Sequence, residues 1–297
     1  MRFSLAGPGR VGSSLAAWAV AAGAELTATA GRLQLGGMSS GGQELLLIAV
    51  PDDALAETAE RLAARPQAAV ALHTSGSRDA AILAPLRAAG SATGSLHPLK
   101  AFAHPFTDPG AAHGVFFALD GETAARRLAQ RMVAAWGGVA GEVPAAARAA
   151  YHLAATLAAG GVATLLGTAA ELAARAGLPK EVVGGYLELA RGTVAEAAEG
   201  AEGEDGPAAT ITGPVARGDI ATFARQVTAL GSLAPERLPL VLELAAETLR
   251  LVAADRPLGA RQSELQAWIA ARTGRPDPGA PGAPGDPGDH AKGSFAI

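Results

Sequence analysis

The chain contains no cysteine among its 297 residues. Disulfide bonds, thiolate metal sites and cysteine nucleophiles are therefore excluded, because each of them needs a thiol. An excess of charge of one sign is missing too, since charged residues make up 18% of the chain and the formal net charge is -4. Without a basic field, nothing points to nucleic acid or an anionic membrane as a partner. We expect a mildly acidic cytoplasmic protein whose partner is a small molecule.

Long apolar runs and targeting signals are also among the features that we do not find. We identify no uncharged apolar run of about 18 residues, the length that a membrane span needs. The N-terminus begins directly with a strand pattern and not with a signal peptide. We therefore expect no membrane anchor. What the chain does have is 49% hydrophobic residues over 297 positions, enough for two domains that each bury a core.

The strongest motif lies at the start of the chain. A strand-like segment, Arg2–Leu5, leads into Gly7–Gly12, which has the pattern Gly-x-Gly-x-x-Gly. In dinucleotide-binding folds the first glycine permits a tight turn, the second admits the pyrophosphate and the third lets the next helix pack closely. Val11–Ala22 has the composition of that buried helix. The motif predicts nucleotide binding, and the alternative is a simple loop in a chain rich in alanine and glycine.

The second expected strand, Glu25–Ala30, indicates which dinucleotide is bound. It ends in Gly31 and Arg32 without a carboxylate. NAD sites place Asp or Glu about 20 residues after the glycines to bind the ribose, whereas a nearby arginine accommodates the NADP phosphate. Arg32 offers a permanently charged fork for such a phosphate. We therefore predict NADP, with NAD less favoured. A solvated surface arginine is the alternative.

The first half of the chain alternates strands with helices. This order predicts an α/β, Rossmann-like, doubly wound sheet with both faces covered. Asp52 and Asp53 follow the third strand and can cap a helix that runs to about Ala64. Further helices are expected at Asp79–Ala89 and up to Trp136. The strands expected after the first two are Glu44–Val50, Ala68–Leu72, Ala92–Leu96 and Val115–Leu119.

Beyond about residue 143 the sequence pattern changes, because no strand-like run follows and the periodicity is that of alanine-rich helices. We predict a Rossmann-like domain at 1–143, an all-α domain at 144–272 and a disordered Gly/Pro-rich tail at 273–297. A long helix at Ala145–Ala176 should form the spine of the second domain. Its apolar surface exceeds what a small bundle can cover, so we expect a homodimer.

Two histidines directly follow expected strands, where loops of a parallel sheet gather around a ligand. His73 begins His-Thr-Ser-Gly and His97 begins His-Pro-Leu-Lys. A group that titrates near neutrality suits proton transfer during reduction of a carbonyl or imine. For each histidine the alternative is a side chain that only hydrogen-bonds its own loop. Ser75 can orient a substrate, and Lys100 can attract an anionic one unless it is an ordinary surface lysine.

Tyr151 and His152 interrupt an Ala/Leu-rich helix and therefore need an explanation. Adjacent helical residues point about 100° apart, so both cannot face one small ligand equally. We take His152 as a second candidate acid or base. Gly160 lies further along the same helix and suggests close approach of a ligand or of another helix.

A polar island between later helices contains Arg217 and Asp219. Asp219 is well placed to cap the helix that begins at Ile220, and we prefer this interpretation to a catalytic one. Arg217 is not needed for a turn. It can bind a substrate carboxylate or a partner subunit.

Five motifs occur in this order along the chain: Ile48–Asp53, His73–Gly76, Gly94–Leu99, Tyr151–Ala155 and Thr212–Asp219. Together they resemble one bacterial family, which pairs a Rossmann-like NADP-binding domain with a helical C-terminal domain of unknown function. The resemblance runs from about Arg2 to Arg272. It implies the superfamily of 6-phosphogluconate dehydrogenase, ketopantoate reductase, pyrroline-carboxylate reductase and prephenate dehydrogenase, in which the helical domain completes the site.

The chain departs from that family at three places. Gly160 and Glu196 stand where members often carry asparagine, and the lysine of the 6-phosphogluconate type is missing, with His152 as the nearest substitute. These departures keep open a nucleotide-binding sensor or scaffold without turnover.

We predict an NADP-dependent oxidoreductase for a small, anionic carbonyl, hydroxy or imine substrate. His97 and His152 are the expected acid and base, and Ser75, Lys100 and Arg217 are the expected substrate contacts; no metal is expected. A deazaflavin-linked or prephenate-dehydrogenase-like enzyme is a further alternative. The predicted cofactor contacts are Gly7, Gly9, Arg10, Val11, Gly12, Arg32, Val50, Pro51, Thr74 and Ser75.

Overall fold

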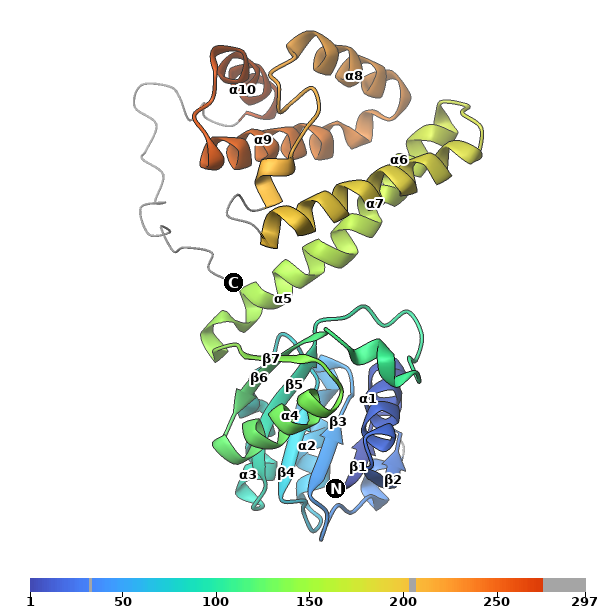
Figure 1. Cartoon of the computed structure of the whole chain (residues 1–297), viewed down its shortest axis with the longest axis vertical. Coiled ribbons are helices and arrows are strands. Elements are labelled where there is room, and N and C mark those ends of the chain that lie inside the picture. The colour runs from blue at the N-terminus through green and yellow to red at the C-terminus, as the bar shows by residue number, and fades with distance from the viewer. Residues whose placement is uncertain (32–33, 203–206, 275–297) are drawn as a thin grey trace. The chain divides into compact units, whose positions relative to one another are not determined.

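The computed structural model describes residues 1–31, 34–202 and 207–274 (Figure 1). They form two compact units, Met1–Val162 and the residues from Ala163 on. Arg32 and nearly all of the predicted tail lie outside the described residues. The predicted domain boundary at residue 143 stays a prediction.

The first unit is built on a seven-stranded sheet with the order β2-β1-β3-β4-β5-β6-β7. The strands β1 to β5 run parallel, β6 pairs antiparallel with β5, and β7 pairs parallel with β6. This topology confirms the predicted Rossmann-like fold. The strands are β1 (Arg2–Ala6), β2 (Glu25–Ala30), β3 (Leu45–Ile48), β4 (Val70–His73), β5 (Ala92–Pro98), β6 (Phe116–Gly121) and β7 (Val139–Glu142).

Helices cover both faces of this sheet (Figure 1). The helices α1 (Arg10–Ala21) and α4 (Thr123–Ala135) cover one face, where Trp18 is buried in a cluster with Phe3 and Phe117. The helices α2 (Leu55–Ala63) and α3 (Ala84–Ala88) cover the other face around the buried residues of β3. Apolar burial on both faces explains why β3, Leu-Leu-Leu-Ile, is a continuous hydrophobic run and not an alternating one.

One strand was not predicted. The strand β7 lies where we placed the end of the α/β domain, and its sequence, Val139-Ala-Gly-Glu142, has only one β-branched residue. Its burial is also slight, so no hydrophobic pattern marks it. The strand forms because its backbone groups pair with those of β6.

The predicted cap of α2 was wrong. Asp52 and Asp53 lie in a short 3-10 turn before α2, and no side chain caps this helix. The Asp52 carboxylate instead accepts a hydrogen bond of 2.5 Å from the Ser77 hydroxyl, across to the loop after β4. Asp52 therefore bonds Ser77, which is distant in the sequence, and not the backbone of the helix that follows it.

The predicted long helix runs from Ala145 to Arg175. It comprises α5 (Arg148–Thr156), a π-helical turn at Leu157–Gly161 and α6 (Val162–Arg175). By length and composition it could cross a membrane, and no residue of its most apolar part is buried. The expectation that no such run exists was wrong, because Leu153–Ala170 carries no charged residue. One such helix is weak evidence for a membrane span.

The second unit is helical throughout its described part. A small core gathers Phe223, Leu249 and Ile269 from three of its helices. Glu171 of α6 forms ion pairs of 2.7 Å with both Arg175 and Arg237. Besides α6, its helices are α7 (Glu181–Glu202), α8 (Ile220–Leu233), α9 (Leu238–Asp255) and α10 (Ala260–Thr273).

Candidate active site

The glycine motif joins β1 to α1 at the edge of the sheet where the strands β1, β3, β4 and β5 end. Gly7 has a φ of +92°, and a Cβ at this position would lie 2.5 Å from the carbonyl oxygen of Ala49. A Cβ on Gly12 would lie 2.2 Å from the carbonyl oxygen of Gly7. Both positions therefore need glycine, the first for the turn and the third for the close approach of α1.

Gly9 is different, because a Cβ on it would meet no protein atom within 4 Å. It is the N-cap residue of α1, and no side chain caps the helix and no acidic residue lies in its first turn. The first N–H groups of a helix have no intrahelical partners and carry a partial positive charge. Free space beside such a terminus fits a phosphate group.

A cavity of about 530 Å³ extends from this helix terminus to the ends of β4 and β5. Gly7 and Gly12 lie behind its wall and do not line it. Asp52, Gly76 and Phe102 contribute to the lining and were not predicted as site residues. The predicted site residues that line the cavity are Gly9, Arg10, Val11, Val50, Pro51, Thr74, Ser75, His97, Lys100 and His152.

His73 is fully buried at the end of β4 and serves its own loop. Its Nε2 lies 3.0 Å from the carbonyl oxygen of Asp79, and its Nδ1 accepts a hydrogen bond from the backbone N–H of Ser75. Because a carbonyl can only accept, Nε2 carries the proton. Burial lowers the pKa of His73 to about 4. A neutral imidazole with both nitrogens occupied holds the loop that lines the cavity.

Ser75 shapes the same loop through its hydroxyl oxygen. That oxygen accepts hydrogen bonds from the backbone N–H groups of Ser77 and Arg78, at 3.2 and 3.1 Å. The Ser75 hydroxyl also lies 3.4 Å from the Ser77 hydroxyl, and because Ser77 donates its proton to Asp52, Ser75 is the donor in this bond.

His97 lies near the carboxyl end of β5 and contacts two side chains of α5. Its Nδ1 lies 2.9 Å from the Tyr151 hydroxyl, and its ring meets that of His152 at a centroid distance of 5.7 Å. Burial, together with the charges of His152 and Arg148, lowers the pKa of His97 to about 4. The imidazole is therefore neutral near pH 7.

Gly76 makes room for this pair of histidines. A Cβ on Gly76 would lie 2.5 Å from Cδ2 of His152 and 2.7 Å from Nε2 of His97. Such distances are too short for any side chain. The loop after β4 thus brings its backbone against both imidazoles.

A second cavity, of about 640 Å³, opens on the other side of the two histidines. His97, His152 and Lys100 line both cavities. The wall of the second cavity is otherwise mostly apolar and small, and the helix residues in it are Tyr151, Ala154, Ala155, Thr156, Ala158, Ala159 and Gly160. A Cβ on Gly160 would meet only Cγ2 of Thr156, at 3.9 Å. No packing contact in the described residues explains this glycine, which therefore leaves space in the cavity.

Arg148 anchors α5 to the sheet edge, and its side chain is 1% exposed. It donates hydrogen bonds to the carbonyl oxygen of Ser75, at 3.2 Å, and to the hydroxyl of Ser95. Its Nε lies 3.9 Å from the Asp120 carboxylate. Burial lowers the pKa of the guanidinium, and Asp120 opposes this shift. These contacts fix where Tyr151, three residues later, meets His97.

Lys100 is placed to meet a ligand from the loop after β5. Its ammonium lies 4.7 Å from the ring centroid of Phe106, and Phe106 in turn packs on Phe102. The aromatic contact holds the cation beside both cavities without neutralising it.

Arg217 and Asp219 belong to the second unit. The Asp219 carboxylate accepts a hydrogen bond of 3.0 Å from the backbone N–H of Thr222, so it caps α8 as expected. Arg217 is exposed. Between them Gly218 has a φ of +68°, and a Cβ there would lie 2.7 Å from the backbone of Arg261.

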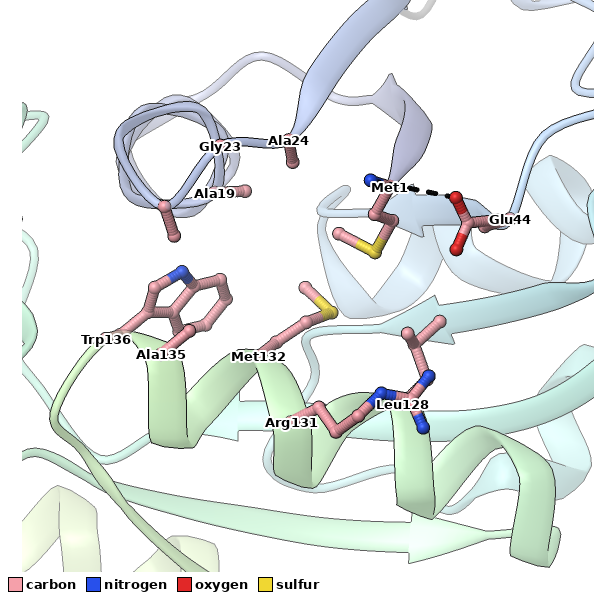
Figure 2. A pocket seen from close by; sticks show the side chains of 11 residues that line it. Met1, Ala19, Gly23, Ala24, Glu44, Leu128, Arg131, Met132, Ala135 and Trp136 are labelled. Carbon is pink, nitrogen blue, oxygen red and sulfur yellow. Dashed lines mark ion pairs between the residues drawn. The ribbon is translucent and has the colours of Figure 1, made fainter.

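A smaller hollow of about 180 Å³ lies at the amino ends of the strands (Figure 2). The Met1 ammonium and the Glu44 carboxylate form an ion pair of 3.7 Å at this hollow, and Met132 and Trp136 of α4 also line it. It holds neither a helix N-terminus nor a histidine. We therefore place the chemistry at the carboxyl ends of the strands.

Three side chains of this region were missed by sequence reasoning. From the sequence alone, Arg148, Tyr151 and Asp52 had no role in the site. The spacing of Arg148 and Tyr151, three apart on one helix, is a signal that they share a face. The contacts of Asp52 and Arg148 with other segments carry no signal in a single sequence.

Residues 115–248 match the family described as Domain of unknown function (DUF2520), and residues 33–98 match the Rossmann-like domain. The chain thus combines a match to the Rossmann-like domain with a match to DUF2520. The segment that matches DUF2520 contains Tyr151, His152 and Arg217, and the segment that matches the Rossmann-like domain contains His73 and His97. No curated protein matches this sequence.

Solved structures share the fold of this chain. A proposed NADP oxidoreductase from Bacteroides fragilis is 18% identical with a TM-score of 0.68, over 83% of this chain and 97% of that one. A protein from Thermotoga maritima is 18% identical with a TM-score of 0.65, over 86% and 99%. Pyrroline carboxylate reductase from Plasmodium falciparum, with NADP bound, is 14% identical with a TM-score of 0.52, over 86% and 95%.

Proposed function

We propose that this protein is an NADP-dependent oxidoreductase for a small carbonyl, hydroxy or imine substrate. The observation that carries the proposal is the cavity that runs from the uncapped N-terminus of α1 to His97 and His152. One end of this cavity could bind a phosphate group, and the two histidines at the other end could transfer a proton. The likeness to a proposed NADP oxidoreductase and to an NADP-bound reductase supports the same class.

The residues around the glycine turn fit a dinucleotide. The free space at Gly9 admits a pyrophosphate beside the first turn of α1. Val50, Pro51 and Thr74 line the path from there towards His97. NADPH, when bound, supplies the hydride. Arg32, outside the described residues, is the proposed partner of the NADP phosphate.

The substrate lies in the second cavity in this proposal. His97 and His152 border both cavities, so each can exchange a proton with a group held between them. Lys100 attracts an anionic group of the substrate, and Ser75 is proposed to orient the substrate. Arg217 is proposed as a further contact with the substrate or with a partner subunit.

A homodimer in the cytoplasm completes the proposal. The helix α7 has no buried residue over positions 181–200, although Leu189 and Val194 are 70% and 55% exposed apolar side chains. Such a face is costly in water and is commonly covered by a second copy.

Titration with NADPH and NADH by calorimetry tests the cofactor. We expect NADPH to bind at least tenfold more tightly than NADH, and Arg32→Ala to remove that preference, because the arginine alone recognises the extra phosphate. Absence of NADPH binding would refute the proposal.

A panel of keto acids, hydroxy acids and imines then tests turnover. We expect His97→Asn to lower kcat by about 100-fold, the usual contribution of a positioned acid or base. NADPH binding without turnover of any panel member would instead favour a nucleotide-binding sensor.

A further inference from the structure

Tyr151 contacts His97, and the proposed function gives this polar side chain no role. It comes from α5, whereas His97 comes from β5. The phenol oxygen lies 2.9 Å from Nδ1 of His97, and the two rings meet edge to face at 89° with centroids 5.6 Å apart. Tyr151 also lines the second cavity.

Both partners of this hydrogen bond are neutral near pH 7. Burial raises the pKa of Tyr151 above its usual range, so the phenol keeps its proton. Burial, with His152 and Arg148 nearby, lowers the pKa of His97 to about 4, so the imidazole is neutral. A neutral phenol can donate to an unprotonated Nδ1 or accept from Nδ1–H, so the contact fits both tautomers of His97. In the tautomer in which the phenol donates to Nδ1, the ring proton is on Nε2.

The Nε2 atom is the one that lies against the loop after β4, where only glycine fits. His97 borders both cavities. An N–H bond at Nε2 can therefore donate to a substrate atom held beside it, as a catalytic acid must.

We propose that Tyr151 fixes His97 as the Nε2–H tautomer and supplies, through His97, the proton that a carbonyl substrate takes up. This inference rests on the proposed function. It makes Tyr151 a positioning residue, because it acts on the substrate only through the imidazole.

The proton balance for a carbonyl substrate is as follows. When hydride forms a C–H bond at the carbonyl carbon, the π-electron pair of C=O moves to oxygen. Nε2 of His97 gives its proton to that oxygen, and Nδ1 takes the phenolic proton of Tyr151. The imidazole remains neutral with its proton on Nδ1. The starting state returns when Nδ1 gives that proton back to the phenolate and Nε2 takes a proton from water. The transfer is downhill because an alkoxide is a stronger base than a phenolate.

The charges around the pair favour this order of events. Arg148, on the same helix as Tyr151, lowers the cost of the transient phenolate. Arg148, His152 and His73 disfavour an imidazolium at His97, whereas Asp52 favours one. Proton transfer through a neutral imidazole avoids forming the imidazolium, which the charges around His97 disfavour.

The anchoring of α5 sets the distance between the two groups. The contacts of Arg148 with Ser75 and Ser95 tie the first turn of α5 to the loop after β4 and to β5. Tyr151 follows one turn later on the helix.

The chain has two tyrosines, Tyr151 and Tyr186, so the ionisation of Tyr151 can be measured directly once Tyr186 is replaced. In a Tyr186→Phe variant the absorbance of the phenolate titrates Tyr151 alone. Nitrogen-15 NMR of the histidine side chains in the full chain reports the tautomer of His97. We compare wild type, Tyr151→Phe and the matched control Tyr186→Phe, each with and without NADPH.

We expect the wild type and Tyr186→Phe to show His97 as the Nε2–H tautomer and Tyr151 to titrate above its usual pKa. Tyr151→Phe should yield a mixture of tautomers and raise the pKa of His97 by about one pH unit, the size of one lost neutral hydrogen bond. A wild-type His97 with its proton on Nδ1, or a Tyr151→Phe spectrum like that of the wild type, would overturn the inference.

Kinetics provide the second readout. With a carbonyl substrate, Tyr151→Phe should lower kcat by about 100-fold and leave KM and the NADPH Kd within about twofold. An unchanged kcat in Tyr151→Phe would overturn the proton-supply step. Failure of NADPH to bind any variant would refute the proposed function alone, since the tautomer of His97 is measured without the cofactor.

Discussion

The two units of the chain differ in how far they bury their side chains. In the first unit the guanidinium of Arg148 is buried beside a carbonyl, a hydroxyl and a carboxylate, although its Nε makes no hydrogen bond with any described residue. In the second unit α7 runs for 22 residues with no buried residue over positions 181–200. The five histidines of the described residues also lie in the first unit. The candidate site thus lies in the first unit, and α7 of the second unit leaves apolar side chains exposed.

The largest expected effect of a substitution separates a buried arginine from an exposed one. Arg148→Ala leaves Asp120 and Ser95 without their buried cation and should lower the free energy of unfolding by about 3–5 kcal/mol. The same change at exposed Arg217, in the second unit, should stay within about 0.5 kcal/mol. Urea denaturation measures both. Equal effects would contradict the anchoring role of Arg148.

Acid should act on the first unit before the second. The folded pKa of about 4 for His73 and for His97 lies below the unfolded value of about 6.5. Between these values the unfolded chain binds more protons, so stability is full above pH 6.5 and falls as the pH drops to 4. For fully buried His73 the loss is on the order of 3 kcal/mol.

The corresponding groups of the second unit titrate at lower pH. Hydrogen bonds lower the pKa of Glu171 and of Asp219, so their stabilisation is lost only as the pH falls below about 4. In a Trp268→Phe variant the remaining tryptophans, Trp18 and Trp136, report the first unit. We expect their urea midpoint to fall between pH 6.5 and 4. A flat midpoint across that range would contradict the neutral buried histidines.

A matched pair of valines tests whether α7 forms the surface of the proposed homodimer. Val194 of α7 and Val139 of β7 are both 55% exposed. Val194→Glu should weaken self-association at least tenfold, because burying a charge at an apolar interface costs more than 1.4 kcal/mol. Val139→Glu should leave it unchanged. Sedimentation measures both, and a monomeric wild type would contradict the dimer.

The smallest expected effect concerns two glycines. Gly184 of α7 has open space where a Cβ would lie, so Gly184→Ala should stabilise the protein by about 0.5–1 kcal/mol. At Gly76 the added methyl would displace His97 and His152, and stability should fall by about 1–3 kcal/mol. Thermal unfolding compares the two variants. Destabilisation by Gly184→Ala would show that another surface approaches α7 there.

Features that depend on local backbone were predictable from the sequence. The glycine motif, the order of strands and helices, and the Asp219 cap follow from short-range rules and were found where expected. The weakly patterned β7 was missed, because its pairing with β6 alone creates it. Asp52 bonds Ser77 and caps no helix, because a tertiary partner competes with the local one.

In the candidate site, too, the sequence predicted residues near the ends of strands but not the contacts between distant segments. His97 and His152 were expected near the ligand edge, and both line the cavity. The contact of Tyr151 with His97, and the burial of Arg148, depend on how α5 meets the sheet edge. No periodicity encodes such a meeting, so these two side chains gained a role only from the structure.

The most direct test of the account is NADPH binding by Gly9→Asp. Gly9 and Gly259 are the N-cap residues of α1 and α10, both with a φ of -76°. Aspartate suits an N-cap and should leave stability unchanged or raise it. At Gly9, however, its carboxylate would occupy the proposed phosphate position and repel the cofactor. We predict that calorimetry finds NADPH binding weakened at least 100-fold by Gly9→Asp and unchanged by Gly259→Asp. Unchanged NADPH binding by a folded Gly9→Asp protein would contradict the central claim.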